Sequence, residues 1–148
     1  MLKAFWRPRT FPVLVAGIFL ASASGCGKGD GKLVPVQGTV KLGDAPLTTG
    51  TVIFRPDASQ GNTSQEEPRG QIDAEGHYTL KTAQQEGAAP GWYKVGIIAA
   101  QHSTDANNPY ALPKSLIPSI YNDPEKSRLA LEVVEKPNPG AYDLTIRK

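Results

Sequence analysis

Cysteine and histidine are scarce in this sequence. Cys26 is the only cysteine in 148 residues, so no disulfide can form within one chain. The two histidines, His77 and His102, lie far apart in the sequence, and no Gly-x-Ser-x-Gly element accompanies them. A nucleophile would need serine or cysteine with a histidine and an acid within reach. We therefore predict no metal site, no cofactor and no enzymatic activity.

An excess of charge of one sign is also lacking. The chain has 16 Lys+Arg against 14 Asp+Glu, and three of the basic residues precede Cys26, which leaves 13 against 14 in the remainder. A balanced chain offers no basic surface for nucleic acid, so we exclude that partner. Long helical patterns are missing too, while 15 Gly and 13 Pro indicate many turns. These features favour an all-β fold.

The first 25 residues have the order of an export signal. Lys3, Arg7 and Arg9 precede an apolar run of 13 residues over 11–23, and small residues then lead to Cys26. A membrane-spanning helix needs roughly 20 apolar residues, so this run predicts a signal peptide over 1–25. The alternatives are an uncleaved membrane helix, a buried core helix, or ordinary secretory cleavage that leaves a free thiol at Cys26.

The segment around Cys26 resembles a bacterial lipoprotein signal, with Ala23 where such signals most often have Leu. The resemblance implies cleavage before Cys26 and attachment of lipid to its thiol. Residues 26–33 would then be the lipidated cysteine and a flexible tether. The protein would be exported and anchored to a bacterial membrane, with its domain facing the periplasm or the exterior. Gly27 stands where an Asp would favour retention at the inner membrane, which favours the outer membrane.

The remaining residues, 34–148, are long enough for one domain. Alternating apolar residues predict seven strands, and seven short strands joined by turns are typical of an antiparallel two-sheet sandwich. We expect Tyr93, Val95 and Ile97 to face the core from a central strand. The expected strands cover residues 34–42, 51–55, 69–73, 77–82, 91–100, 127–134 and 142–146.

A long connection over 101–118 lacks alternation and contains three prolines. Connections of this length within a compact domain are uncommon and are often functional. Tyr110 and Leu112 are therefore candidate partner contacts, although the apolar residues of this segment would equally serve to cover a sheet edge or the open end of the sandwich.

Two further features have a structural and a functional interpretation. Trp92, the only tryptophan after Cys26, would face outward, where it could stack on a sugar ring or be covered by a loop. Asp73 and Glu75 supply two carboxylates, but a calcium loop of the EF-hand kind requires more ligands. The spacing from Asp73 to Gly76 favours a hairpin turn instead.

Five motifs follow one another in a fixed order along the domain. They are Val36-Gln37-Gly38-Thr39-Val40, Gly43-Asp44-Ala45-Pro46-Leu47, the segment from Gly50 to Pro56, the segment from Asp73 to Leu80, and Gly91-Trp92-Tyr93-Lys94-Val95. This motif order resembles the carboxypeptidase regulatory-like, transthyretin-like domain found in short bacterial lipoproteins. That resemblance implies a β-sandwich over 34–148 and no catalysis, because no peptidase domain is attached. It implies a non-enzymatic, lipid-anchored envelope protein serving as an interaction or structural module, or alternatively a carbohydrate- or peptide-binding module, with an envelope protein or a glycan as its partner.

Overall fold

The computed structural model describes residues 31–101 and 112–148. Cys26, His102 and Tyr110 lie outside these ranges. The first backbone pairing among the described residues is an antiparallel bridge between Val34 and Ala88. Within the same ranges, no helix has the length and hydrophobicity of a membrane span.

Strands and turns make up nearly all of the described chain. Two short 3-10 helices, η1 (Ala58–Gln60) and η2 (Ser119–Asn122), are the helical elements among these residues. The strands are β1 (Gln37–Leu42), β2 (Ala45–Pro46), β3 (Gly50–Pro56), β4 (Arg69–Ile72), β5 (His77–Thr79), β6 (Lys81–Thr82), β7 (Gln85–Glu86), β8 (Gly91–Ile98), β9 (Ala100–Gln101), β10 (Lys114–Ser115), β11 (Leu129–Val133) and β12 (Leu144–Ile146).

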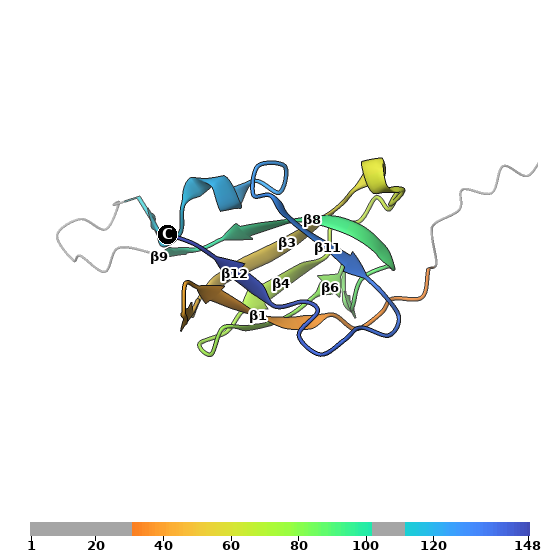
Figure 1. Ribbon diagram of the computed structural model, residues 1–148, viewed down its shortest axis with the longest axis horizontal. Coiled ribbons are helices and arrows are strands. Elements are labelled where there is room, and N and C mark those ends of the chain that lie inside the picture. Colours follow the sequence, from red (N-terminus) through yellow and green to blue (C-terminus); the bar gives the residue numbers. More distant parts are fainter. Residues whose placement is uncertain (1–30, 102–111) are drawn as a thin grey trace, which may run out of the picture.

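One curled sheet holds most of these strands, in the order β11-β8-β3-β4-β5-β1-β12. All neighbouring pairs along this path are antiparallel except β1 and β12, which are parallel. β1 continues the sheet because its first half pairs with β5 and its second half with β12. The curl brings β1 and β12 across from β3 and β8 in the view of Figure 1. The prediction of an all-β fold is confirmed.

The sheet differs from the expected sandwich in one respect. Each of the seven predicted ranges contains a strand, but β1 joins the two halves into one hydrogen-bonded sheet of ten strands, beside the small β9-β10 pair. The additional strands are all two residues long: β2, β6, β7, β9 and β10. Strands this short carry no readable alternation of apolar and polar residues, so periodicity alone could not find them.

The core lies inside the curl. Tyr93, Val95 and Ile97 of β8 are fully buried, as predicted, and β8 has a strand on both sides. At the centre, the ring of Phe54 lies 5.6 Å from that of Tyr93 and 6.5 Å from that of Tyr78, measured between centroids. Burial of this apolar set is the main stabilising contribution to the fold.

The segment before β12 is fixed to β1 and β5 by polar contacts. The buried Tyr78 hydroxyl donates to the Tyr142 carbonyl at 2.6 Å. The Asp143 carboxylate accepts from both the backbone N–H and the hydroxyl of Thr39, at 2.8 and 2.9 Å. These bonds place the last strand beside Gly38, where the two backbones lie in close contact.

The described part of the long connection covers one end of the core. Ile117 is buried, Leu116 packs against the core, and the Leu116 N–H donates to the Ala99 carbonyl at 3.0 Å. Leu112, in contrast, is 88% exposed. The covering role therefore holds for residues 116 and 117, and Leu112 stays free of the core.

Candidate functional site

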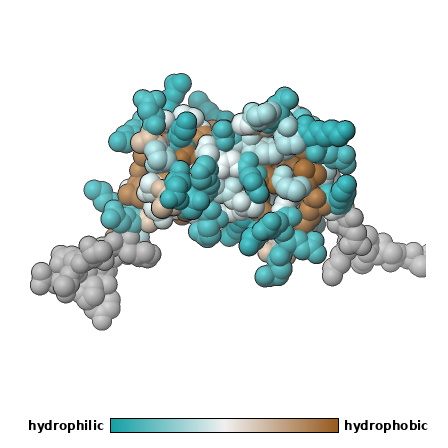
Figure 2. Space-filling view, turned by 90° about the horizontal axis from the view of Figure 1, so that it is seen from below, coloured by the Kyte–Doolittle hydropathy of each residue, from teal (hydrophilic) through white to brown (hydrophobic). Residues whose placement is uncertain are grey.

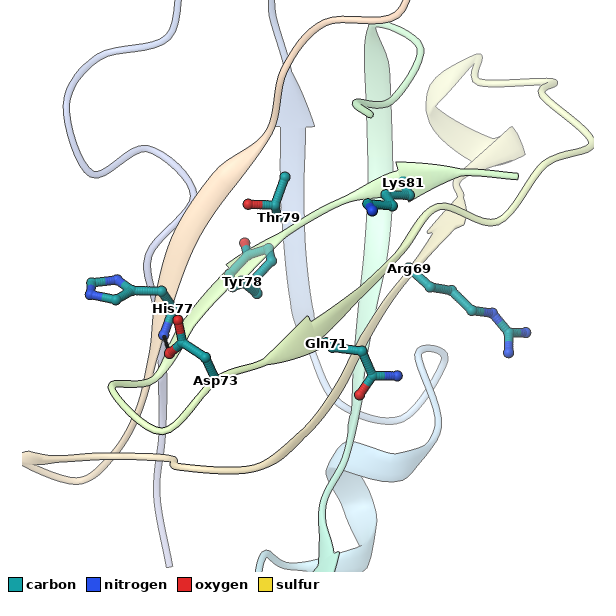
Figure 3. Close-up of a pocket in the computed structure, with 7 residues that line it drawn as sticks. All are labelled: Arg69, Gln71, Asp73, His77, Tyr78, Thr79 and Lys81. Carbon is teal, nitrogen blue, oxygen red and sulfur yellow. Dashed lines mark hydrogen bonds between the residues drawn. The ribbon is translucent and has the colours of Figure 1, made fainter. Parts of the chain in front are cut away.

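The candidate site is a shallow hollow of about 350 Å³ on the outer face of β4, β5 and β6. Six polar side chains and the Tyr78 position line it (Figure 3). Tyr78 itself points into the core, so the chemistry of the hollow comes from the outward residues of these strands and the adjoining turn. The six polar residues are Arg69, Gln71, Asp73, His77, Thr79 and Lys81.

Strand register arranges these residues in three rows. Arg69 is directly opposite Lys81. The same antiparallel register, which also pairs Ile72 with Tyr78, sets Gln71 opposite Thr79. Asp73 and His77 form the third row, where the Asp73 N–H donates to the His77 carbonyl at 2.9 Å. Because side chains two residues apart share a face, all three rows point outward together.

A hairpin turn forms the acidic end of the hollow. One Asp73 carboxylate oxygen accepts from the backbone N–H groups of Glu75 and His77, at 3.0 and 2.7 Å. Gly76 has a φ of 85°, the left-handed region that favours glycine. The predicted hairpin turn is therefore confirmed, and half of the Asp73 carboxylate is engaged in building it.

Arginines and a glutamate form the basic end. The Glu67 carboxylate pairs with Arg55 Nε at 2.8 Å and with Arg69 Nη2 at 3.2 Å. The pKa of Glu67 is lowered, first by the hydrogen bond from Arg55 and further by that from Arg69, against the opposing effect of partial burial. Lys81 takes part in no ion pair among the described residues, although Glu86 is its neighbour across β6 and β7.

The lowered pKa of Glu67 leads to a pH-dependent prediction. Since the folded-state pKa lies below the unfolded value of about 4.3, the carboxylate stabilises the fold at neutral pH, and this contribution is lost as the pH falls through the folded-state pKa. Glu67→Gln should therefore lower the Tm most at pH 7, and the gap from wild type should close below about pH 4. Thermal melts between pH 3 and pH 7 measure this. Glu66→Gln, at an exposed neighbour without an ion pair among the described residues, should show no such gap.

The hollow contains none of the candidate contact residues that the sequence predicted. His77, for which we predicted neither a metal site nor a catalytic role, lines the hollow, while Tyr110 and His102 lie outside the described residues. Trp92 is 37% exposed on β8 and Leu112 precedes β10, and neither lines the hollow. Among the described residues, no group of three or more His, Cys, Asp or Glu is placed to hold a metal ion.

Sequence reasoning missed Arg69, Gln71, Thr79 and Lys81 as a group. The alternation of residues 77–82 puts His77, Thr79 and Lys81 on the face opposite to Tyr78 and Leu80, and in the structure Tyr78 and Leu80 are the buried members. What the sequence did not give is the register between β4 and the β5–β6 segment, which sets Arg69 against Lys81. A turn of known length between the two strands was the available signal, because turn length fixes register.

A second hollow of about 380 Å³ lies beside the chain that leads to β12. Its lining is largely proline, glycine and alanine, with Gln37, Asn138 and Tyr142 as the polar members. It holds no charged side chain, so it offers less specific chemistry than the first hollow.

Comparison with protein-family models, curated protein sequences and solved structures gives no match to this chain.

Proposed function

We propose that this protein is a non-enzymatic, lipid-anchored component of a bacterial cell envelope that acts as an interaction module. The observation that carries the proposal is the hollow on β4, β5 and β6, where six polar side chains from three strand rows share one outer face. Residues on a paired sheet are held more rigidly than residues on a loop, which suits them to binding. The proposal includes a signal peptide over 1–25 and lipid at Cys26.

The position of the domain start supports a role as a tethered module. The first described residues lie at one end of the long axis, while β9 and the C-terminus lie at the other (Figure 1). A lipid at Cys26 would therefore hold the domain by one end and leave the sheet face with the hollow open along the side. Three acyl chains, at about 0.8 kcal/mol for each buried methylene, would make such an anchor effectively permanent.

The proposed architecture is a transthyretin-like sandwich. Seven strands at the expected positions, curled around one core, support this assignment, with the β1 crossover joining the two walls. A fold of this kind hosts many functions, so the activity has to be argued from the site.

The anchor is tested by Cys26→Ser, which removes the thiol and keeps the size of the side chain. We expect the variant to leave the membrane fraction or to accumulate as an uncleaved precursor, and mass spectrometry should find acylated Cys26 at the amino end of the wild type. Ser24→Ala is the control and should remain membrane-bound. Wild-type protein that begins at another residue, without lipid, would contradict the proposal.

The contact surface is tested by filling the hollow. Gln71→Tyr places a ring over its centre, and Thr145→Tyr makes the same type of change at an exposed residue of β12 that does not line the hollow. Crosslinking and pull-down from the native envelope should lose partners for the first variant and keep them for the second. Equal capture by both variants would show that the partner is met elsewhere.

Carbohydrate or peptide binding is the second candidate function. The row of Gln71 and Thr79 favours it, because amides and hydroxyls supply the paired donors and acceptors that sugars and peptides require.

A further inference from the structure

We propose that the hollow binds an acidic polysaccharide, with one carboxylate held between Arg69 and Lys81 and the sugar chain lying along β4. This inference rests on the proposed function of the hollow as a contact surface and names its ligand class.

The row of Arg69 and Lys81 places two cations opposite one another on the sheet face. Glu67 pairs with Arg69 at 3.2 Å, but it also pairs with Arg55 and so cannot neutralise both arginines. Glu86 is the cross-strand neighbour of Lys81 on β7, yet Lys81 takes part in no ion pair among the described residues. The Arg69 and Lys81 side chains therefore both have donors that a bound carboxylate can accept from.

The rest of the hollow sets the direction of the ligand. From Arg69 to Asp73 the strand advances about 13 Å, from the basic row through Gln71 and Thr79 to the acidic turn. Figure 3 shows Arg69 and His77 reaching to opposite sides of the hollow, as two ends of a site. Asp73 repels a second anion at its end. The ligand's carboxylate is therefore directed to the basic row. The hydroxyls of its sugar ring then lie within reach of the Gln71 amide and the Thr79 hydroxyl in the middle row.

Backbone pairing argues against a peptide ligand. β4 lies between β3 and β5, and β5 lies between β4 and β1, so neither strand has a free edge to which a peptide could add. The outward residues of the hollow also provide no apolar pocket for peptide side chains. On the face seen in Figure 2, apolar residues gather toward the two ends, with pale and teal residues between them. A ligand recognised by side chains alone, through its hydroxyls and a carboxylate, fits the polar lining of the hollow better.

A galacturonic acid trisaccharide and its methyl ester make a matched pair of probes, since they share a backbone and differ in charge. We expect the full chain in detergent micelles to bind the acid in isothermal titration calorimetry, with affinity falling as salt rises. The ester should bind about tenfold more weakly or not at all, and Lys81→Gln should weaken binding of the acid by about tenfold, as loss of a charged hydrogen bond predicts.

Lys41→Gln is the control, because Lys41 is an exposed lysine of β1 outside the hollow, and its variant should bind as the wild type does. Lys81→Gln should leave the Tm close to that of the wild type, because Lys81 is exposed and takes part in no ion pair among the described residues, so loss of binding cannot be assigned to unfolding. Equal binding of acid and ester, or unchanged binding by Lys81→Gln, would overturn the inference. An oligoglutamate of matched charge that binds as tightly as the trisaccharide would overturn it in favour of an acidic peptide. If Gln71→Tyr loses envelope partners while the trisaccharide fails to bind wild type, the contact surface stands and the ligand class is wrong.

Discussion

Gly38→Ala should lower the free energy of unfolding by about 3 to 5 kcal/mol, because the added methyl group has no space. A Cβ at Gly38 would lie 2.2 Å from the Tyr142 carbonyl oxygen, 2.7 Å from its carbon and 3.0 Å from the ring of Tyr78. Backbone atoms cannot rotate away, so the segment before β12 would have to move. That movement would break the bond from the Tyr78 hydroxyl to the Tyr142 carbonyl.

Gly43→Ala is a matched control that separates steric clash from backbone strain. Gly43 has a φ of 66° with open space around its Cβ position, so alanine there meets conformational strain and no contact. We expect a cost of about 1 to 2 kcal/mol for this variant. Chemical denaturation followed by circular dichroism measures both changes. If Gly38→Ala costs no more than Gly43→Ala, the contact between β1 and the chain before β12 is looser than described.

The sequence was sufficient for the strands that carry a regular pattern. Val36 and Val40, Val52 and Phe54, and Tyr93, Val95 and Ile97 of β8 are buried on one face of their strands, as their spacing predicts. The hydrophobic effect enforces this spacing, since a shift by one residue would turn every apolar side chain of a strand to the solvent. The alternation of apolar and polar residues is a local property of each strand, and that is why the buried face can be predicted from the sequence.

The burial of Ile53 and the composition of the candidate site depend instead on contacts between residues distant in the sequence. Ile53 has the outward parity of β3 and yet is only 7% exposed. It lies beside Gly96, on which Pro124 packs so closely that a Cβ at Gly96 would lie 2.9 Å from the proline ring. No local pattern indicates that this proline covers the outer face, because the contact requires the chain to return from residue 124 to the centre of the sheet.

The candidate site was harder to predict for the same reason. Alternation alone puts His77, Thr79 and Lys81 outward, but a site is defined by which residues meet. The facing of Arg69 and Lys81 follows from the hairpin between β4 and β5, and the neutralising position of Glu67 follows from the path of the loop before β4. Neither is encoded in the period of one strand.

Phe54→Ala should cost about 3 to 5 kcal/mol, the range for removing a buried aromatic ring. Phe54 is fully buried on β3, and its ring lies between those of Tyr78 and Tyr93, which belong to strands on either side of it in the sheet order. Loss of the ring leaves a cavity that these two tyrosines cannot fill, because the hydroxyls of both are held by backbone carbonyls, at 2.6 Å for Tyr78 and 2.8 Å for Tyr93.

Thr51→Ala on the outer face of the same strand serves as the control, and it should change stability by no more than about 0.5 kcal/mol. A double-mutant cycle between Phe54→Ala and Tyr93→Ala gives the coupling of the two rings, which should reach about 0.5 to 1.5 kcal/mol beyond the burial of area. An unchanged m-value in denaturant melts would show that the variants expose the same amount of surface on unfolding as the wild type does.

A cost for Phe54→Ala below that of Thr51→Ala would mean that β3 turns its other face to the core. In that case Arg69 would point inward with Ile53, and the outer hollow would lose its basic row, so the same measurement tests the geometry on which the binding proposal depends.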